Sequence, residues 1–246
     1  MSTHTFPIIF ENTHALIIDK PAGVIVHPDD RQEEYTIAHW MKETYALDNV
    51  GDEGREGVVH RLDRNTTGVL VLAKDVQTFK SLKRQFHDHT VRKVYHAIVE
   101  GNIRHDTGII SLPLARAKSD FRKRTVVDAF AQDTRGEERE AITRYKVLDR
   151  TEYEGKHFTY VEVYPLTGRT HQIRAHFRAI RHPIIGDDLY GSRNGKNDAK
   201  RSMLHAYTIT LSLPNDEGKE EEKTVVSPVP QDMLEVLKKL GFSKIA

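Results

Sequence analysis

The chain has 246 residues, with 37 Lys and Arg, 36 Asp and Glu, 14 His and no Cys. Its length and its 38% of hydrophobic residues indicate a globular protein with a real core, and they exclude a disordered or fibrous protein. The absence of cysteine excludes disulfides, zinc–thiolate sites, iron–sulfur clusters and a cysteine nucleophile, while the net charge of +1 gives no overall sign of nucleic-acid binding.

The hydrophobic pattern predicts strands more often than helices. In chain order we expect strands at 7–10, 15–19 and 24–27, a helix at 35–47, a doubly buried strand at 69–72, a helix at 76–89, strands at 91–99, 108–112, 142–148 and 158–165, a helix at 170–180, a strand at 203–213 and a helix at 231–240. Several strands follow one another with no helix between them. This order predicts an α+β fold with a largely antiparallel mixed sheet flanked by helices, rather than a doubly wound parallel sheet.

The sequence shows no boundary between domains, so we expect one domain over residues 1–246. Its start lacks the basic and apolar segments of a signal peptide, and its apolar runs are far shorter than the roughly 20 residues that span a bilayer. We therefore expect a cytoplasmic protein without a membrane partner, and a monomer by default.

Charge is unevenly distributed along the chain. Residues 80–124 contain eleven Lys and Arg but only four Asp and Glu, and residues 164–181 contain four Arg and no acidic residue. The compensating acids lie at 48–56, 137–140 and 216–222. Such segregation is typical of an anion-binding face on a protein of neutral average charge, although solvated faces with chance clustering explain it too.

The first candidate for chemistry is the polar segment 60–68, which leads directly into the strand predicted at 69–72. Asp63 lies in its middle, and the hydroxyl groups of Thr66 and Thr67 and the backbone N–H groups near Gly68 can orient its carboxylate toward a cleft. The alternative is a loop in which Asp63 caps its own backbone. The spacing alone does not separate these two interpretations.

The second candidate is the segment 167–176, which enters the helix predicted at 170–180. Arg169 and the first N–H groups of that helix are placed to form an anion site, and Arg174 and Arg178 share one helical face. An amphipathic surface helix with ordinary arginines is the alternative. The histidine pairs His87/His89 and His171/His176 do not share a helical face and have no carboxylate at metal-ligand spacing, so we expect no metal site.

Several motifs in order resemble the RluA-type pseudouridine synthases, over about residues 8–213. They are Asp19-Lys20-Pro21-Ala22-Gly23, Val26-His27-Pro28, His60-Arg61-Leu62-Asp63 with Thr67-Gly68, the strand 92–101 around Tyr95, the segment 167–176, His182-Pro183-Ile184-Ile185-Gly186-Asp187 and Leu204-His205-Ala206. The family often has Ser where Thr67 stands, which keeps the hydroxyl group. The chain begins directly at the catalytic region, so we expect no separate N-terminal RNA-binding domain.

The resemblance implies two half-domains on either side of a catalytic cleft, and an isomerase that joins ribose C1′ of an RNA uridine to uracil C5 without cofactor or metal. It implies that Asp63 is the catalytic carboxylate, with Arg174 paired to it and Tyr95 stacked on the uracil. Because a base inside a stack is out of reach, Arg61 would fill the gap left by a flipped uridine.

The other residues that the resemblance places at the substrate are His60, Thr67, Leu204 and Arg169, and the basic stretch 116–124 is expected to contact phosphates. The expected partner is structured RNA, either ribosomal or transfer RNA. Two other functions remain open on the sequence: a non-catalytic RNA-binding or chaperone protein with the same fold, and a metal-dependent phosphohydrolase that uses the His-rich segments.

Overall fold

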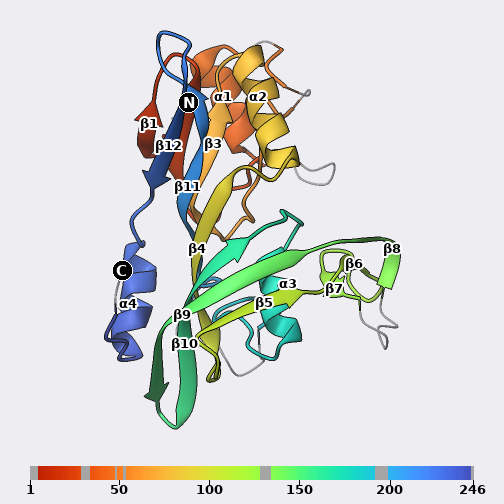
Figure 1. Ribbon diagram of the computed structural model, residues 1–246, viewed down its shortest axis with the longest axis vertical. Helices are drawn as coiled ribbons and strands as arrows, with labels where there is room; N and C mark the ends of the chain where they lie inside the picture. Colours follow the sequence, from red (N-terminus) through yellow and green to blue (C-terminus); the bar gives the residue numbers. More distant parts are fainter. Residues whose placement is uncertain are drawn as a thin grey trace. The chain divides into compact units, whose positions relative to one another are not determined.

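The computed structural model describes residues 5–28, 34–47, 49–51, 54–127, 134–191 and 199–244 (Figure 1). These residues form two compact units. Unit 1 consists of the chain up to Lys93 together with Ala206–Pro228, and unit 2 consists of Val94–His205 and the chain from Val229 onward. The chain therefore passes from one unit to the other three times, after Lys93, after His205 and after Pro228.

Unit 1 contains an antiparallel array in which β2 (Ala15–Lys20) lies between β1 (Ile8–Glu11) and β3 (Thr67–Ala73). The strand β11 (Leu204–Pro214) follows β3 in the sheet order, and β12 (Glu220–Val226) pairs with β11. Every residue of β3 is buried, as the apolar run 69–72 predicted. The strand that leaves the Asp63 segment is therefore a rigid central element.

Two helices of unit 1 begin at side-chain caps. In α1 (Ile37–Tyr45), Thr36 and His39 exchange side-chain and backbone hydrogen bonds in a capping box. In α2 (Val76–His87), the Asp75 carboxylate accepts a hydrogen bond of 2.8 Å from the Thr78 N–H. The helix α2 packs against β3 (Figure 1).

Unit 2 contains the antiparallel order β4-β10-β9-β5, formed by β4 (Arg92–Glu100), β10 (Lys156–Pro165), β9 (Ile142–Tyr153) and β5 (Thr107–Ser111). A second sheet has the order β7-β6-β8, formed by β7 (Arg124–Val126), β6 (Leu114–Ala117) and β8 (Thr134–Arg139). The helix α3 (Gln172–Ala179) packs against β7, β9 and β10. Near the C-terminus, α4 (Gln231–Lys239) follows Pro230 (Figure 1).

The predicted α+β class with a largely antiparallel sheet is confirmed, and the four predicted helices are present. The strand predicted at 24–27 is wrong, because Ile25 makes only an isolated parallel bridge to Thr36. The strands β6, β7, β8 and β12 were not predicted, because β6 and β7 are only four and three residues long and charged residues fill much of β8 and β12. None of the helices in the described part of the chain is long and apolar enough to cross a membrane.

Candidate active site

The Asp63 segment is a tight connection that ends at the start of β3. The backbone N–H of Thr66 donates to the Asp63 carbonyl at 3.0 Å, and Thr66 and Thr67 are buried while Asp63 is half-buried. Gly68 has a φ of +111°, and a Cβ at this position would lie 2.2 Å from the Ala206 carbonyl oxygen. Only glycine fits this contact, so the end of the Asp63 segment is fixed by the close approach of two backbones.

Lys20, at the end of β2, contacts the same segment through its side chain. Its side chain is completely buried, and its Nζ donates to the carbonyl oxygens of Pro21 at 2.8 Å, Val24 at 2.9 Å and Arg64 at 2.9 Å. An ammonium group has three donors, and these three bonds match them. The Lys20 charge therefore joins the turn after β2 to the residue that follows Asp63.

His60 joins the beginning of the segment to β3. Its Nε2 accepts a hydrogen bond of 3.0 Å from the Val71 N–H, and its ring stacks on Phe86 with the ring centroids 4.5 Å apart. Burial, with a further contribution from the Lys93 charge, lowers the pKa of His60 to about 3. The imidazole is therefore neutral at physiological pH and acts here as a backbone acceptor.

Arg61 and Arg64 lie on either side of Asp63 and contact the segment 21–28. The Nη1 of Arg61 lies 3.2 Å from Nε2 of the buried His27, whose Nδ1 lies 2.8 Å from the Pro28 carbonyl. A His27 proton on Nδ1 satisfies both contacts, since Nε2 then accepts from Arg61. The Nε of Arg64 donates to the Gly23 carbonyl at 3.2 Å, and its Nη2 pairs with Glu34.

In unit 2, Arg174 is buried on α3 and binds a carboxylate through a bidentate contact. Its Nε donates to Asp187 Oδ2 at 2.6 Å and its Nη2 to Asp187 Oδ1 at 2.8 Å, while Nη2 also lies 3.1 Å from Asp188. The buried Asp187 carboxylate accepts further bonds from the N–H groups of Leu189 and Tyr190. Hydrogen bonds and charge from Arg174 keep the pKa of Asp187 below its usual range despite burial.

Tyr190 connects this ion pair to the second sheet of unit 2. Its N–H donates to Asp187 at 2.9 Å, and the Arg174 guanidinium lies 5.2 Å from the centroid of its ring. The Tyr190 hydroxyl accepts a hydrogen bond of 2.7 Å from the Arg124 N–H on β7. The same tyrosine thus contacts both the buried arginine and the basic strand β7.

Three other predicted site residues also lie in unit 2. Tyr95 is half-buried on β4, opposite Val163 of β10. Leu204 is buried at the start of β11, and its carbonyl accepts from Arg201 Nη1 at 3.2 Å. Arg169 precedes α3, where its N–H donates to Gln172 Oε1 at 3.0 Å and its Nε to the Glu140 carbonyl at 3.1 Å. These contacts fix the backbone around Leu204 and Arg169.

The structure brings the predicted site residues together in two groups. His60, Arg61, Asp63 and Thr67 share one segment of unit 1, and Tyr95, Arg169, Arg174 and Leu204 belong to unit 2. The pairing of Arg174 with Asp63 joins residues of different units and stays a prediction.

His176 bonds to Thr143 Oγ1 and the Leu112 carbonyl, and the described residues contain no group of three or more His, Asp or Glu arranged to hold a metal ion.

The sequence analysis missed two partners. Lys20 and Asp187 were noted only as members of motifs, without a role. Lys20 donates to backbone carbonyls, including that of Arg64 beside Asp63, and Asp187 forms an ion pair with Arg174. The signal was a charged residue next to a turn residue in each motif, Pro21 after Lys20 and Gly186 before Asp187.

Comparison with known proteins places the chain in a family. The family model described as RNA pseudouridylate synthase matches residues 14–179, about two thirds of the chain. This stretch includes the Asp63 segment and Arg174. The chain belongs to the RNA pseudouridylate synthase family. The RluA-type resemblance is thereby confirmed.

Individual members of this family are similar to the chain in sequence. An uncharacterized RNA pseudouridine synthase of Aquifex aeolicus is 39% identical over 188 residues, which cover 76% of this chain and 56% of that protein. Ribosomal large subunit pseudouridine synthase D of Zymomonas mobilis is 34% identical over 245 residues, which cover 96% of this chain and 73% of the relative. Among three of the curated relatives that it matches, the chain spans 56% to 65% of their length.

A solved structure of the family has the same architecture. The human RNA pseudouridylate synthase domain containing 1 superposes with a TM-score of 0.72 at 27% identity, covering 93% of this chain and 85% of that one. The agreement extends over nearly the whole chain and includes both units.

Proposed function

We propose that this protein is an RNA pseudouridine synthase in which Asp63 is the catalytic carboxylate. The observation that carries the proposal is the family match over residues 14–179, because it includes the Asp63 segment. The geometry supports it, since Lys20, His60 and Gly68 fix this segment on both sides of Asp63. A reactive side chain on a segment held in this way meets the positional precision that catalysis demands.

The proposed reaction breaks the bond between ribose C1′ and uracil N1 and joins C1′ to C5, after which the proton on C5 is lost. Three routes are open to Asp63. The carboxylate adds to, or stabilises, an oxocarbenium-like sugar, as carboxylates do in glycoside hydrolysis; it removes a ribose proton to form a glycal; or it adds to uracil C6. In each route Tyr95 stacks on the uracil and takes part in proton removal from C5.

The remaining predicted residues complete the proposed site. Arg174 keeps Asp63 ionised and oriented, Arg61 occupies the gap left by the flipped uridine, and Leu204 packs beside the base. His60 supports the segment from its β3 side. Arg169 and the basic residues of 116–124 contact phosphates, which supply affinity without reading sequence.

We further propose that the substrate is ribosomal RNA of the large subunit rather than transfer RNA. Support comes from relatives of Pseudomonas aeruginosa, Borreliella burgdorferi and Zymomonas mobilis, each called ribosomal large subunit pseudouridine synthase D, at 32% to 34% identity. The segments 48–57 and 117–140, parts of which lie outside the described residues, are the proposed determinants of the site chosen, since RNA is read largely through its shape and its flipped bases.

The test is the variant Asp63→Asn, produced in a strain that lacks the wild-type protein. Pseudouridines in ribosomal and transfer RNA are mapped by mass spectrometry after chemical labelling. We expect at least one large-subunit position to lose its pseudouridine in the deletion strain, to regain it with the wild type and the control Asp88→Asn, and to stay unmodified with Asp63→Asn. Full modification by Asp63→Asn would refute the proposed mechanism, and a change only in transfer RNA would refute the proposed substrate.

A further inference from the structure

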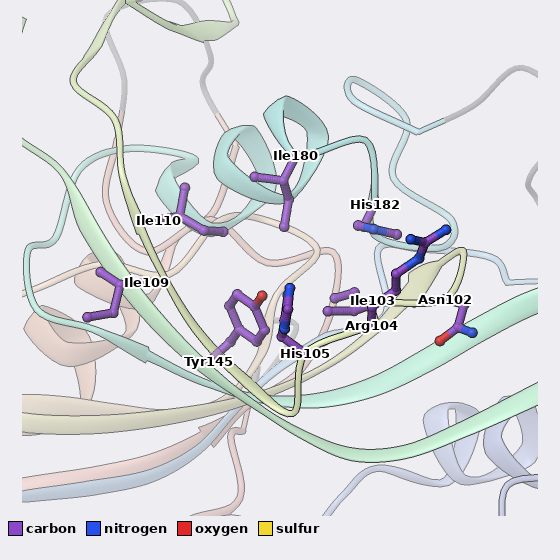
Figure 2. Close-up of a pocket in the computed structure, with 9 residues that line it drawn as sticks. All are labelled: Asn102, Ile103, Arg104, His105, Ile109, Ile110, Tyr145, Ile180 and His182. Atoms are coloured by element: carbon purple, nitrogen blue, oxygen red, sulfur yellow. The ribbon is translucent and has the colours of Figure 1, made fainter.

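Unit 2 contains a pocket of about 330 Å³ that includes none of the proposed catalytic residues (Figure 2). Two of its lining residues, Ile103 and Ile110, are almost fully buried. The other lining residues include Tyr145 of β9, Ile180 at the end of α3 and residues of the loop between β4 and β5. This volume is at the small end of the range of about 300–1,000 Å³ for small-molecule sites, which suits a single small planar group.

The loop between β4 and β5 is fixed by hydrogen bonds to neighbouring strands. Thr159 Oγ1 donates to the Gly101 carbonyl at 2.7 Å and accepts from the Ile103 N–H at 3.1 Å. Arg150 donates through Nε to the Ile103 carbonyl at 2.8 Å and through Nη2 to the Arg104 carbonyl at 3.3 Å. The pocket wall is therefore formed in advance of binding, which lowers the entropy cost of a ligand.

An aromatic side chain forms one wall of the pocket. Tyr145 lies directly opposite Gly108 of β5, and a Cβ on Gly108 would come within 2.4 Å of the phenol ring and its oxygen. The glycine thus leaves the space that the ring occupies. A tyrosine hydroxyl is protonated at neutral pH, and burial raises the pKa of Tyr145 further, so this hydroxyl is able to donate a hydrogen bond to a ligand.

The rim of the pocket is positively charged and partly apolar. Arg104 and His105 are exposed there, and no carboxylate lines the pocket. Within the described part of the chain no carboxylate pairs with the Arg104 guanidinium, and the adjacent Asp106 is bound by Arg150 at 2.6 Å. Ile109, 62% exposed, has the highest exposure of the large hydrophobic residues described. An apolar, aromatic interior with an arginine at its rim is chemically suited to a nucleobase that carries a phosphate.

We propose that this pocket binds one unstacked nucleotide of the RNA substrate, at a position other than the uridine that is isomerised. The base lies between Tyr145 and the isoleucines, and Arg104 contacts its phosphate. This inference rests on the proposed function, because it takes RNA as the ligand. It gives unit 2 a contact that selects RNAs with a second unpaired nucleotide.

The first experiment locates the RNA by cross-linking. The full chain is irradiated with a single-stranded uridine-rich 12-mer that contains 4-thiouridine, and the cross-linked peptides are identified by mass spectrometry. We expect adducts within residues 102–110 or at Tyr145. Absence of adducts in both places would overturn the proposal. So would uridine 5′-monophosphate shifting the NMR signals of these residues while the 12-mer leaves them unchanged, since the site would then serve a free nucleotide.

The second experiment measures the affinity for the 12-mer between 50 and 200 mM salt. Arg104→Gln is expected to lower the slope of log Kd against log salt by about 0.7, the value for one phosphate contact on a single strand, whereas the exposed control Lys156→Gln leaves the slope unchanged. Equal slopes for the two variants would overturn the role of Arg104. Ile109→Ser changes only an exposed side chain, and we expect it to weaken binding about threefold with an unchanged melting temperature.

Failure of this inference is distinguishable from failure of the proposed function. Cross-linking and salt dependence report on the pocket alone, whereas pseudouridine formation by Asp63→Asn reports on catalysis. If Asp63→Asn is inactive and the pocket neither cross-links nor alters the salt slope, only the nucleotide pocket is refuted. If Asp63→Asn retains full activity while the pocket results are positive, the proposed mechanism alone is refuted.

Discussion

The Asp63 segment of unit 1 and the Arg174 region of unit 2 are both fixed in place, but by different interactions. Around Asp63, Lys20 and the neutral His60 bond to backbone groups on either side of the catalytic candidate. Around Arg174, the fixing interaction is a buried ion pair with Asp187. The supporting side chains of the first region bond to backbone groups, whereas in the second region two opposite charges bond to each other.

The two kinds of support suit the different roles proposed for Asp63 and Arg174 in the reaction. A carboxylate that must react needs a fixed position, and the bonds of Lys20 and His60 to the backbone on either side of Asp63 supply it. An arginine that must keep one orientation gains from a bidentate partner, because the planar fork then has a fixed direction. The two regions should therefore respond differently when a supporting residue is removed.

The largest effect is expected from Asp187→Ala. Removal of this carboxylate breaks the bidentate contact to the buried Arg174 guanidinium, and breaking a buried pair typically costs about 3–5 kcal/mol of folding free energy. The control Asp188→Ala removes an exposed contact to the same guanidinium and should cost less than about 1 kcal/mol. Urea unfolding monitored by circular dichroism measures both, and equal losses in the two variants would contradict the buried-pair interpretation.

An intermediate effect is expected from Lys20→Met, which removes three hydrogen bonds to carbonyls around the Asp63 segment. We expect a loss of about 2–3 kcal/mol in stability, and a fall of tenfold to about 100-fold in the rate of pseudouridine formation because the segment moves. Both are measured on purified protein, by urea unfolding and by single-turnover assays on substrate RNA.

Lys74→Met is the matched control for Lys20→Met. Lys74 directly follows β3, whereas Asp63 precedes the start of that strand. Its Nζ bonds to Glu11 Oε1 at 3.0 Å and to the Asn12 carbonyl at 2.8 Å. We expect a stability loss of about 1 kcal/mol and an unchanged rate. A rate loss shared by both variants would show that general destabilisation, rather than support of Asp63, explains the Lys20 result.

The parts of the fold that were predictable from sequence are those with a clear local pattern. The strand β3 and the helices α1 and α2 follow local patterns, an apolar run in one case and helical spacing with a capping residue in the other two. The strands β8 and β12 carry mostly charged, exposed residues, so the alternation that marks a strand is absent from their sequence.

The candidate site was predictable only where its residues are close in sequence. The Asp63 segment was recognised as a unit because its polar residues directly precede a buried strand. Helical spacing alone left open whether Arg174 belongs to a site or to an exposed helix face shared with Arg178, and the structure buries Arg174 while Arg178 is exposed. Its burial depends on Asp187, which a turn with Gly186 at a φ of +72° brings back to α3. Helical spacing contains no information about such a partner 13 residues away.

The smallest effect, and the one that separates the two regions most directly, is the pH dependence due to His60. The folded chain binds a proton at His60 only near pH 3, whereas the unfolded chain binds it near the ordinary value of 6.5. Between these values the unfolded state holds more protons, so the free energy of unfolding should fall as the pH is lowered, by at most about 1.4 kcal/mol per pH unit.

His60→Gln keeps an acceptor for the Val71 N–H and removes this titration. Its free energy of unfolding should therefore fall less steeply between pH 7 and pH 5 than that of the wild type, whereas the exposed control His87→Gln should follow the wild type. His96, whose pKa is lowered to about 4 by burial, contributes the same slope to all three proteins and cancels in the comparison. If His60→Gln and the wild type have equal slopes, the imidazole is not held neutral in the fold. The Asp63 segment would then be supported by a charged imidazole as well as by the Lys20 ammonium group.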